Sequence, residues 1–289
     1  MTIVQAIRDI SMREHLAASK RTEFEYVVAC RADWSRTEFL VHLADDVSPE
    51  AVGEWRTAAA QLSLGYPAEY LTGRAQFCDL SLDIEEGVLV PRSETESLVE
   101  RAADRVGEVL QSSRPLVGFE PCSGSGAISL AMADRLPTAR MIGVDIDATA
   151  VRCALRSARR IGVTDRVTFM QANVLCSWNG FRRFAPAGFD FVISNPPYVT
   201  GERIQAAIES SPREPVHALY GGPDGLLFYR AIVERARRAL RPGGLLFLEI
   251  DEGLEAAILK MLYASGMTNC RWFKDLQGLP RYMEARQEQ

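Results

Sequence analysis

The stretch Val192-Ile193-Ser194-Asn195-Pro196-Pro197-Tyr198 decides how this chain is organised. The apolar run that starts at Phe189 is typical of a buried strand, and it ends at two prolines, which have no N–H for a sheet. Because each proline ring fixes its own φ angle, the backbone leaves the strand along a rigid path. Asn195 adds an amide oxygen and two N–H groups, and Tyr198 adds an aromatic face. The pattern indicates a rigid cluster of acceptors for a planar group that carries N–H, although a proline turn that only ends a strand would have the same sequence.

The residues before this stretch repeat the order strand, turn, helix, which predicts a parallel sheet with crossover helices. A first strand, 116–120, runs into the turn Pro121-Cys122-Ser123-Gly124-Ser125-Gly126, and a helix follows over 127–136. Glycines let the backbone of such a turn approach a ligand, and the helix N-terminus beyond offers free N–H groups. Position 129 is Ser, so the turn does not match the G-x-G-x-x-G fingerprint and is weak evidence by itself.

The next two strands end on polar side chains. The second ends on Asp145, about 20 residues after the turn, where an acid can accept both hydroxyls of a ribose. Asp145 could instead cap the next helix, although Asp147 could fill that role. The third strand, 167–173, ends on Asn173, whose amide could bond an adenine edge. Because the carboxyl ends of parallel strands share one rim, the turn and these residues, with Asn195, predict a site for a nucleoside-like cofactor.

The flanking segments complete a two-domain plan. Residues 1–72 show helical periodicity, which predicts a small helical domain that either recognises a protein substrate or caps the second domain. Ser48-Pro49-Glu50 is a predicted N-cap with Pro at N1. In 73–92 the alternating run 77–84 predicts a strand, with Val88–Val90 as the return arm of a hairpin that links the domains.

Residues 93–289 form the second predicted domain. Ser93, with Glu96 three residues later, has the spacing of a capping box. Beyond the Asn-Pro-Pro-Tyr stretch, a helix is expected from Asp224 to Leu240, then a strand over 245–250 and a helix over 254–264. An antiparallel pair, 268–273 with 281–285, closes the sheet.

Composition limits the possible functions. The 289 residues are 47% hydrophobic and 25% charged, which is typical of a globular protein, and no apolar run reaches membrane-spanning length. The start of the chain lacks a signal-peptide pattern. Six scattered cysteines without a Cys-x-x-Cys pair argue against structural zinc and favour a reducing cytoplasm. A net charge of −5 offers no general field for nucleic acid.

Taken together, the motifs resemble the release factor glutamine methyltransferases, a family of class I methyltransferases that use S-adenosylmethionine. The resemblance covers nearly the whole chain and implies a Rossmann-like α/β fold with a mostly parallel seven-stranded sheet. Besides the helical N-terminal domain and Ser194–Tyr198, it rests on these segments: Leu71-Thr72-Gly73, Leu89–Glu96, Gly124–Ile128, Glu214-Pro215 with Ala218-Leu219, and Gly221–Leu226.

The resemblance implies direct methyl transfer to an amide nitrogen, with a release factor as partner and no metal. Asn195 Oδ1 and the Pro196 carbonyl would each accept one N–H of the acceptor amide, and Tyr198 would pack on its plane. Substrate contacts would also come from Pro197, Arg92 and Glu94, although the last two could simply begin a helix. The implied cofactor contacts are Glu120, Cys122, Ser123, Gly124, Ser125, Gly126, Asp145, Ile146, Asn173, Val174 and Asn195.

Departures from the family pattern leave other functions open. Glu120 stands where the family usually has Asp, Cys122 where it commonly has Gly, and Val174 where a larger side chain often covers adenine. A diverged relative acting on another amide or amine, a nucleic-acid amino-methyltransferase and a non-catalytic module therefore remain alternatives. An acidic N-terminal segment, with 8 Lys/Arg against 11 Asp/Glu over 1–75, argues against nucleic acid. We expect a cytoplasmic monomer.

Overall fold

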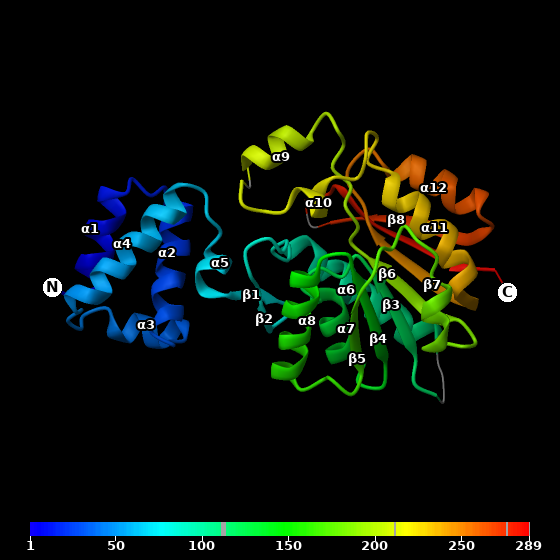
Figure 1. The fold of residues 1–289 in the computed structure, drawn as a ribbon, viewed down its shortest axis with the longest axis horizontal. Helices are drawn as coiled ribbons and strands as arrows, with labels where there is room; N and C mark the ends of the chain where they lie inside the picture. The colour runs from blue at the N-terminus through cyan, green and yellow to red at the C-terminus, as the bar shows by residue number, and fades with distance from the viewer. Residues whose placement is uncertain (111–113, 211, 276, 289) are drawn as a thin grey trace. The chain divides into compact units, whose positions relative to one another are not determined.

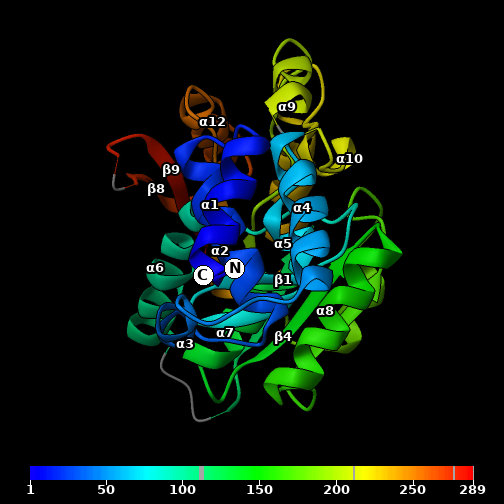
Figure 2. The same cartoon turned by 90° about the vertical axis from the view of Figure 1, so that its left-hand side faces the viewer.

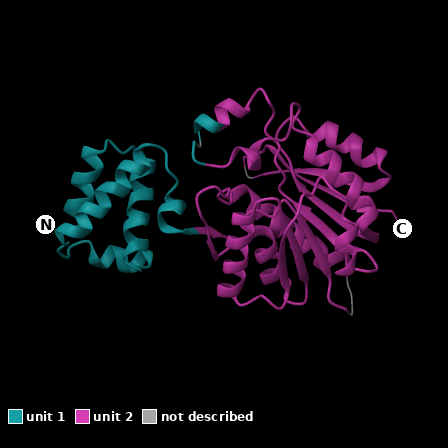
Figure 3. Ribbon diagram, viewed as in Figure 1, with its two compact units in different colours: residues 1–74, 208–213 teal, residues 75–207, 214–289 magenta. Residues whose placement is uncertain are grey.

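A computed structural model describes residues 1–110, 114–210, 212–275 and 277–288 of the chain. The chain divides into two compact units (Figure 3): Met1–Arg74 with Ile208–Arg213, and Ala75–Ala207 with Glu214–Gln289. Within the described ranges no helix is both long and apolar enough to cross a membrane.

The first unit is built from helices, as predicted. Figure 2 shows α1, α2 and α4 of this unit, and α2 contacts α3, α4 and α5. Ser48 caps α4 through the Ala51 N–H at 3.2 Å, with Pro49 at N1, so the predicted cap is confirmed. Buried side chains such as Phe24, Phe39 and Leu62 fill the core between the helices. The helices are α1 (Ile3–Arg13), α2 (Ala18–Arg31), α3 (Arg36–His42), α4 (Pro49–Ser63) and α5 (Ala68–Thr72).

The predicted hairpin has different arms in the structure. The two-stranded sheet consists of β1 (Arg74–Phe77) and β2 (Leu80–Asp83), and 88–90 is not a strand. The prediction was wrong because the chain reverses inside the alternating run, at Cys78 and Asp79. Both residues have positive φ angles, 48° and 64°, as two-residue hairpin turns of the primed type require. Neither is a glycine, so the usual sequence signal for such a turn is missing.

The second unit contains the predicted seven-stranded sheet, in the order β5-β4-β3-β6-β7-β9-β8. The first five strands of this order, from β5 through β4, β3 and β6 to β7, pair in parallel. Strand β9 runs antiparallel to both of its neighbours, β7 and β8. This confirms the mostly parallel sheet and the closing antiparallel pair. The strands are β3 (Val117–Pro121), β4 (Arg140–Asp145), β5 (Val167–Gln171), β6 (Phe189–Ser194), β7 (Leu240–Glu249), β8 (Met267–Lys274) and β9 (Pro280–Gln287).

Helices cover both faces of this sheet (Figure 1). One apolar core joins the sheet to α6 (Ser93–Val109), α7 (Ala127–Arg135) and α8 (Ala148–Ile161). A second core joins it to η1 (Asn179–Arg183), α11 (Leu227–Ala239) and α12 (Glu255–Ala264). Two short helices, α9 (Ile204–Ser210) and α10 (Val216–Leu219), lie in the connection between β6 and α11.

The order of the strands indicates where along the edge of the sheet a ligand site is expected. The chain winds outward in one direction from β3 to β5 and in the other from β6 to β7, so the strand order reverses between β3 and β6. In open α/β sheets, ligands bind outside the carboxyl ends of the strands at such a reversal. The turn at 121–126 follows β3 and Asn195 follows β6, so both predicted motifs lie at this point.

At the other end of β6, its start, a buried carboxylate pairs with two arginines. Asp190 is fully buried, and its two carboxylate oxygens accept hydrogen bonds from the Arg114 guanidinium at 2.8 and 2.9 Å. The same carboxylate accepts the Val117 N–H at 2.8 Å and forms an ion pair with Arg241. These contacts join the starts of β3, β6 and β7, because a buried carboxylate is stable only when it is paired and hydrogen-bonded.

Candidate active site

Two cavities of the second unit meet at Asn195. The larger, about 190 Å³, is lined mainly by the ends of β3, β4 and β5 and by 215–218. The smaller, about 60 Å³, is lined by 89–92, by Thr95 and by the turn after β3. Asn195 and Cys122 line both cavities, so the residue predicted to hold the substrate amide lies where the two cavities adjoin.

Residues with positive φ angles form the turn after β3, and two of its glycine N–H groups are hydrogen-bonded within the protein. Cys122, Gly124 and Gly126 have positive φ angles of 59°, 51° and 81°. A Cβ on Gly124 would meet nothing within 4 Å, so this glycine borders open space. Its N–H, however, donates to Asp145 Oδ2 at 2.7 Å, and the Gly126 N–H donates to the Ser123 carbonyl at 2.8 Å. The free N–H groups were expected at the N-terminus of the helix beyond the turn, and there the Ser129 N–H is not free, because it donates to Glu120 Oε2 at 2.9 Å.

Asp145 lies on the rim of the larger cavity and does not cap α8. Asp147 takes that role, with its carboxylate accepting the Thr149 N–H at 2.6 Å. Asp145 Oδ1 accepts the Asp147 N–H at 2.9 Å, and Oδ2 accepts the N–H of the glycine turn. Burial raises the pKa of Asp145 despite these bonds. Each oxygen has a second lone pair, so the carboxylate can still accept hydroxyl groups of a ligand.

The rest of the larger cavity is mostly apolar. Predicted residues Ile146, Asn173 and Val174 line it, and Asn173 Oδ1 accepts the Leu175 N–H at 2.9 Å, which fixes its amide. Phe228 at the start of α11 also lines the cavity and was missed, because nothing in the local pattern distinguishes it from a core residue.

His217 was also missed as a residue of the larger cavity. Its sequence context indicates only a surface or packing residue. In the structure its Nε2 lies 3.4 Å from Oδ2 of Asp147, the cap of α8, and both residues line this cavity.

Glu120 lies beside the smaller cavity as a buried acid. Its Oε2 accepts the N–H of Ser129 at 2.9 Å and also bonds the Ser129 hydroxyl. Burial raises the pKa of Glu120 to about 8, so the group is largely neutral near pH 7. Ser123 Oγ, which lines the same cavity, is buried without a hydrogen-bond partner among the described residues. A ligand that brings polar atoms would satisfy this hydroxyl.

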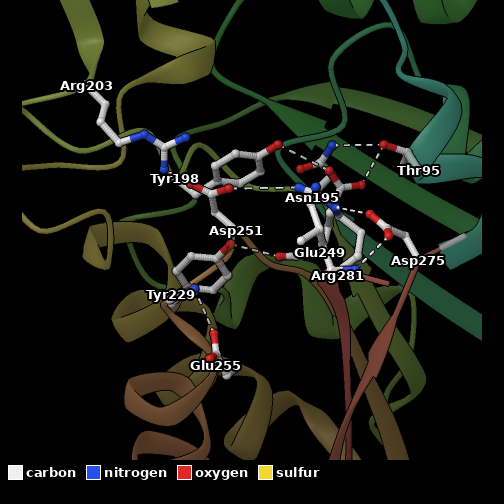
Figure 4. A network of polar contacts seen from close by, with 12 residues as sticks. Thr95, Asn195, Tyr198, Arg203, Tyr229, Glu249, Asp251, Glu255, Asp275 and Arg281 are labelled. Carbon is white, nitrogen blue, oxygen red and sulfur yellow. Dashed lines mark hydrogen bonds and ion pairs between the residues drawn. The ribbon is translucent and has the colours of Figure 1, made fainter. Parts of the chain in front are cut away.

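A single carboxylate connects the two predicted catalytic side chains (Figure 4). Asn195 Nδ2 donates to Thr95 Oγ1 at 3.1 Å, and the Thr95 hydroxyl donates to Glu249 Oε2 at 2.6 Å. Tyr198 donates to the other oxygen, Oε1, at 3.3 Å. Thr95 and Glu249 are both buried, and neither was predicted as a site residue. Thr95 stands two residues beyond the expected helix start, and Glu249 ends an apolar strand, which were the available signals.

Arg92 and Glu94 differ in their placement. Arg92 lines the smaller cavity and forms an ion pair with the buried Glu214, which also accepts the Val90 N–H at 3.2 Å. Glu94 lines neither cavity and accepts the Ser93 hydroxyl at 3.1 Å. Of these two residues, only Arg92 lines a cavity that Asn195 also lines.

The predicted capping box at Ser93 is wrong. Helix α6 begins at Ser93 itself, and its N-cap residue, Arg92, makes no side-chain cap. Glu96, the second member of the expected box, accepts the Cys78 N–H of the hairpin turn at 3.2 Å instead.

A glycine loop after α10 supports the backbone of the Asn-Pro-Pro-Tyr segment. The Val199 N–H donates to the Leu219 carbonyl at 2.8 Å, and the Gly221 N–H returns to the Val199 carbonyl at 2.9 Å. A Cβ on Gly221 would lie 2.6 Å from Tyr198 Cα, and one on Gly225 would lie 2.5 Å from the Tyr198 carbonyl oxygen. Only glycines allow this close approach.

Two family models match the chain in separate segments. Residues 5–73 match the PrmC N-terminal domain, and residues 111–213 match the methyltransferase small domain. Among curated proteins, the release factor glutamine methyltransferase of Moorella thermoacetica is 34% identical over 286 residues, which cover 98% of this chain and 95% of that protein. The enzyme of the same name from Geobacter sulfurreducens is 33% identical, covering 92% of this chain and 89% of that protein.

Solved structures share the fold of the second unit at low identity. A methyltransferase from Pyrococcus furiosus aligns with a TM-score of 0.51 and 19% identity, over 73% of this chain and 90% of that one. A human methyltransferase 10 domain containing protein aligns with a TM-score of 0.52 and 17% identity, over 72% and 89%. Both support a methyltransferase fold.

Proposed function

Since the chain belongs to the release factor glutamine methyltransferase family, we propose that it methylates the side-chain amide nitrogen of the glutamine in the Gly-Gly-Gln motif of peptide-chain release factors. The methyl donor is S-adenosylmethionine, which supplies an electrophilic methyl group when bound. The partner is the release factor itself.

The residues around the larger cavity fit this cofactor. Asp145 offers carboxylate oxygens for the ribose hydroxyls, and Val174 and Phe228 offer apolar surface for the base. Around the smaller cavity, the buried Ser123 hydroxyl has no hydrogen-bond partner among the residues that the structure describes, and Glu120 lines the same cavity. An ammonium group of the cofactor near Glu120 would favour the charged carboxylate, as an opposite charge does.

Asn195 and Pro196 would orient the acceptor amide. The lone pair of a glutamine nitrogen is delocalised into its carbonyl, so the nitrogen is a weak nucleophile until it is positioned. Asn195 Oδ1 and the Pro196 carbonyl each accept one N–H, which fixes the nitrogen. These two bonds strengthen as positive charge grows on that nitrogen, so they stabilise the transition state more than the ground state. Methyl transfer would break the bond between sulfur and the methyl group and release S-adenosylhomocysteine, and the proton then lost from nitrogen would pass to solvent.

The observation that carries this proposal is the orientation of the Asn195 amide. Its nitrogen is engaged with Thr95, and no donor in the described part of the chain bonds its oxygen. Because Asn195 lines both cavities, this oxygen is available to an acceptor amide beside the cofactor space.

The test uses purified protein, isotope-labelled S-adenosylmethionine and a release factor, with a mass shift on the Gly-Gly-Gln peptide as the readout. We expect label on wild-type release factor and none on a factor whose glutamine is replaced by alanine. Asn195→Ala should lose at least about 100-fold in turnover while it still binds the cofactor. Asn179→Ala, an exposed asparagine of η1, is the matched control and should turn over normally. Label on nucleic acid and not on release factor would refute the proposal.

A further inference from the structure

We propose that Glu249 and Thr95 are positioning residues that hold the Asn195 amide with its oxygen toward the acceptor. The inference rests on the proposed function, because it explains how Asn195 presents its side-chain oxygen to the substrate amide. It adds to that function two residues that act on the substrate through Asn195.

The direction of each hydrogen bond follows from the carboxylate. An ionised carboxylate only accepts hydrogen bonds, so the Thr95 hydroxyl, 2.6 Å away, donates its single hydrogen to Glu249 Oε2. The Thr95 oxygen then has only lone pairs to offer Asn195, 3.1 Å away. The Asn195 side chain must therefore present nitrogen to Thr95, which leaves its oxygen as the outward acceptor. Without this bias, an amide can rotate by half a turn and exchange its nitrogen and oxygen.

The same carboxylate also restrains Tyr198. Its Oε1 accepts the tyrosine hydroxyl at 3.3 Å, and the Glu249 backbone carbonyl accepts the buried Tyr229 hydroxyl at 2.8 Å (Figure 4). Glu249, a buried side chain of β7, thus restrains Tyr198 directly. It restrains Asn195, which follows β6, through Thr95 of α6. This arrangement is more than general packing, because both predicted catalytic side chains depend on it.

The charge state of Glu249 is balanced by its surroundings. Burial raises the pKa of Glu249 to about 7, while the Thr95 hydrogen bond and the Arg281 guanidinium oppose that rise. Arg281 lies between Asp251 and Asp275, and Arg203 from the loop after β6 pairs with Asp251. The titratable and charged groups around Glu249, from α6, β7, β9 and the loops beside them, are Glu94, Tyr198, Arg203, Tyr229, Asp251, Asp275 and Arg281.

Protonation of Glu249 would reverse the chain of donors. A neutral carboxyl can donate to Thr95 Oγ1, and the threonine hydrogen is then free to turn toward residue 195. The Asn195 oxygen would be drawn to that hydrogen and away from the acceptor. Turnover should therefore fall as the pH decreases through about 7, since the acceptor geometry requires ionised Glu249.

The first experiment compares threonine variants with release factor as substrate. Thr95→Val keeps the shape but removes the hydroxyl, and kcat should fall roughly 10- to 100-fold, while the KM for release factor and the Kd for cofactor change less than about threefold. Thr95→Ser keeps the hydroxyl and should recover most of the loss. Thr268→Val is the matched control. It removes a hydroxyl of β8 that donates to the Arg286 carbonyl of β9 at 3.3 Å. Wild-type kcat in Thr95→Val, or equal losses in the valine and serine variants, would overturn the inference.

The second experiment follows Glu249. In Glu249→Gln the acidic fall in kcat should disappear, because no group at that position titrates. An unchanged acidic limb in Glu249→Gln would overturn the role given to Glu249.

NMR of the Asn195 side-chain amide, assigned by comparison with Asn195→Ala, tests the hydrogen bond without any turnover. One N–H should be protected in wild type and lose protection in Thr95→Val. If wild type leaves release factor unmodified, the proposed function fails, and the NMR result alone decides the positioning role. Absence of a protected N–H in wild type would refute it.

Discussion

Replacing Gly221 by alanine should disable the acceptor site while the protein stays folded. The added Cβ would lie 2.6 Å from Tyr198 Cα and 2.8 Å from both the Pro197 oxygen and the Tyr198 carbonyl carbon. Ordinary contact begins at 3.4 Å, so the closest atom is too near by about 0.8 Å, and all three atoms belong to the backbone. No flexible side chain can yield, so the segment after Pro196 must shift. A misplacement of about 1 Å can cost roughly 100-fold in rate, and we expect a loss of that order in kcat.

The assay is methylation of release factor at saturating cofactor, with cofactor affinity and melting temperature measured in parallel. The overpacking should lower stability by about 1–3 kcal/mol, which leaves a typical domain folded. Gly107→Ala, at an exposed site in α6 where an added Cβ meets nothing within 4 Å, is the matched glycine control. Normal turnover in folded Gly221→Ala would refute the claim that the glycine loop sets the backbone of the Asn-Pro-Pro-Tyr segment.

Two further outcomes concern buried charges. Glu120→Gln should change how the free energy of unfolding depends on pH. Because burial raises the pKa of Glu120 from 4.5 to about 8, wild type should lose up to roughly 4 kcal/mol of stability relative to the variant as the pH rises through that interval. Thermal unfolding of both proteins at several pH values measures this, and parallel curves would contradict it. Arg92→Ala leaves the buried Glu214 carboxylate without its cation. Chemical denaturation should show a free energy of unfolding lower by about 1–3 kcal/mol, a figure reduced because the arginine side chain is 40% exposed. Adding Glu214→Gln should recover much of the loss, whereas an Arg92→Ala protein as stable as wild type would show that the pair contributes nothing.

Much of the second unit could be predicted because its signals are local. The apolar run of β6, the acid that ends β4 and the turn after β3 each follow from a few adjacent residues, and parallel strands bring their ends together. The helix cap at Ser48 was equally local. The errors arose where contacts between distant residues decide the outcome. Glu96 looked like the partner of Ser93 but bonds Cys78, 18 residues earlier, because the hairpin turn packs against α6.

The positioning residues were missed for the same reason. Thr95 and Glu249 are 154 residues apart, and each looks ordinary in its own segment, one in a helix start and one in an apolar strand. Only the fold places a carboxylate from β7 behind the amide that follows β6. A polar residue at the end of an apolar strand was nevertheless visible, and it had already identified Asp145 and Asn195 correctly as residues of the rim.

The two ends of β6 have different tasks, and this separation matters for engineering. Asp190 and its arginines tie the start of the six-residue strand to its neighbours, and Asn195 follows the other end of that strand. Redesign aimed at robustness can therefore be directed to the arginine side of the sheet, whereas a change of acceptor specificity has to be sought on the opposite rim. A variant library that mixes both sides would confuse failures of folding with failures of recognition.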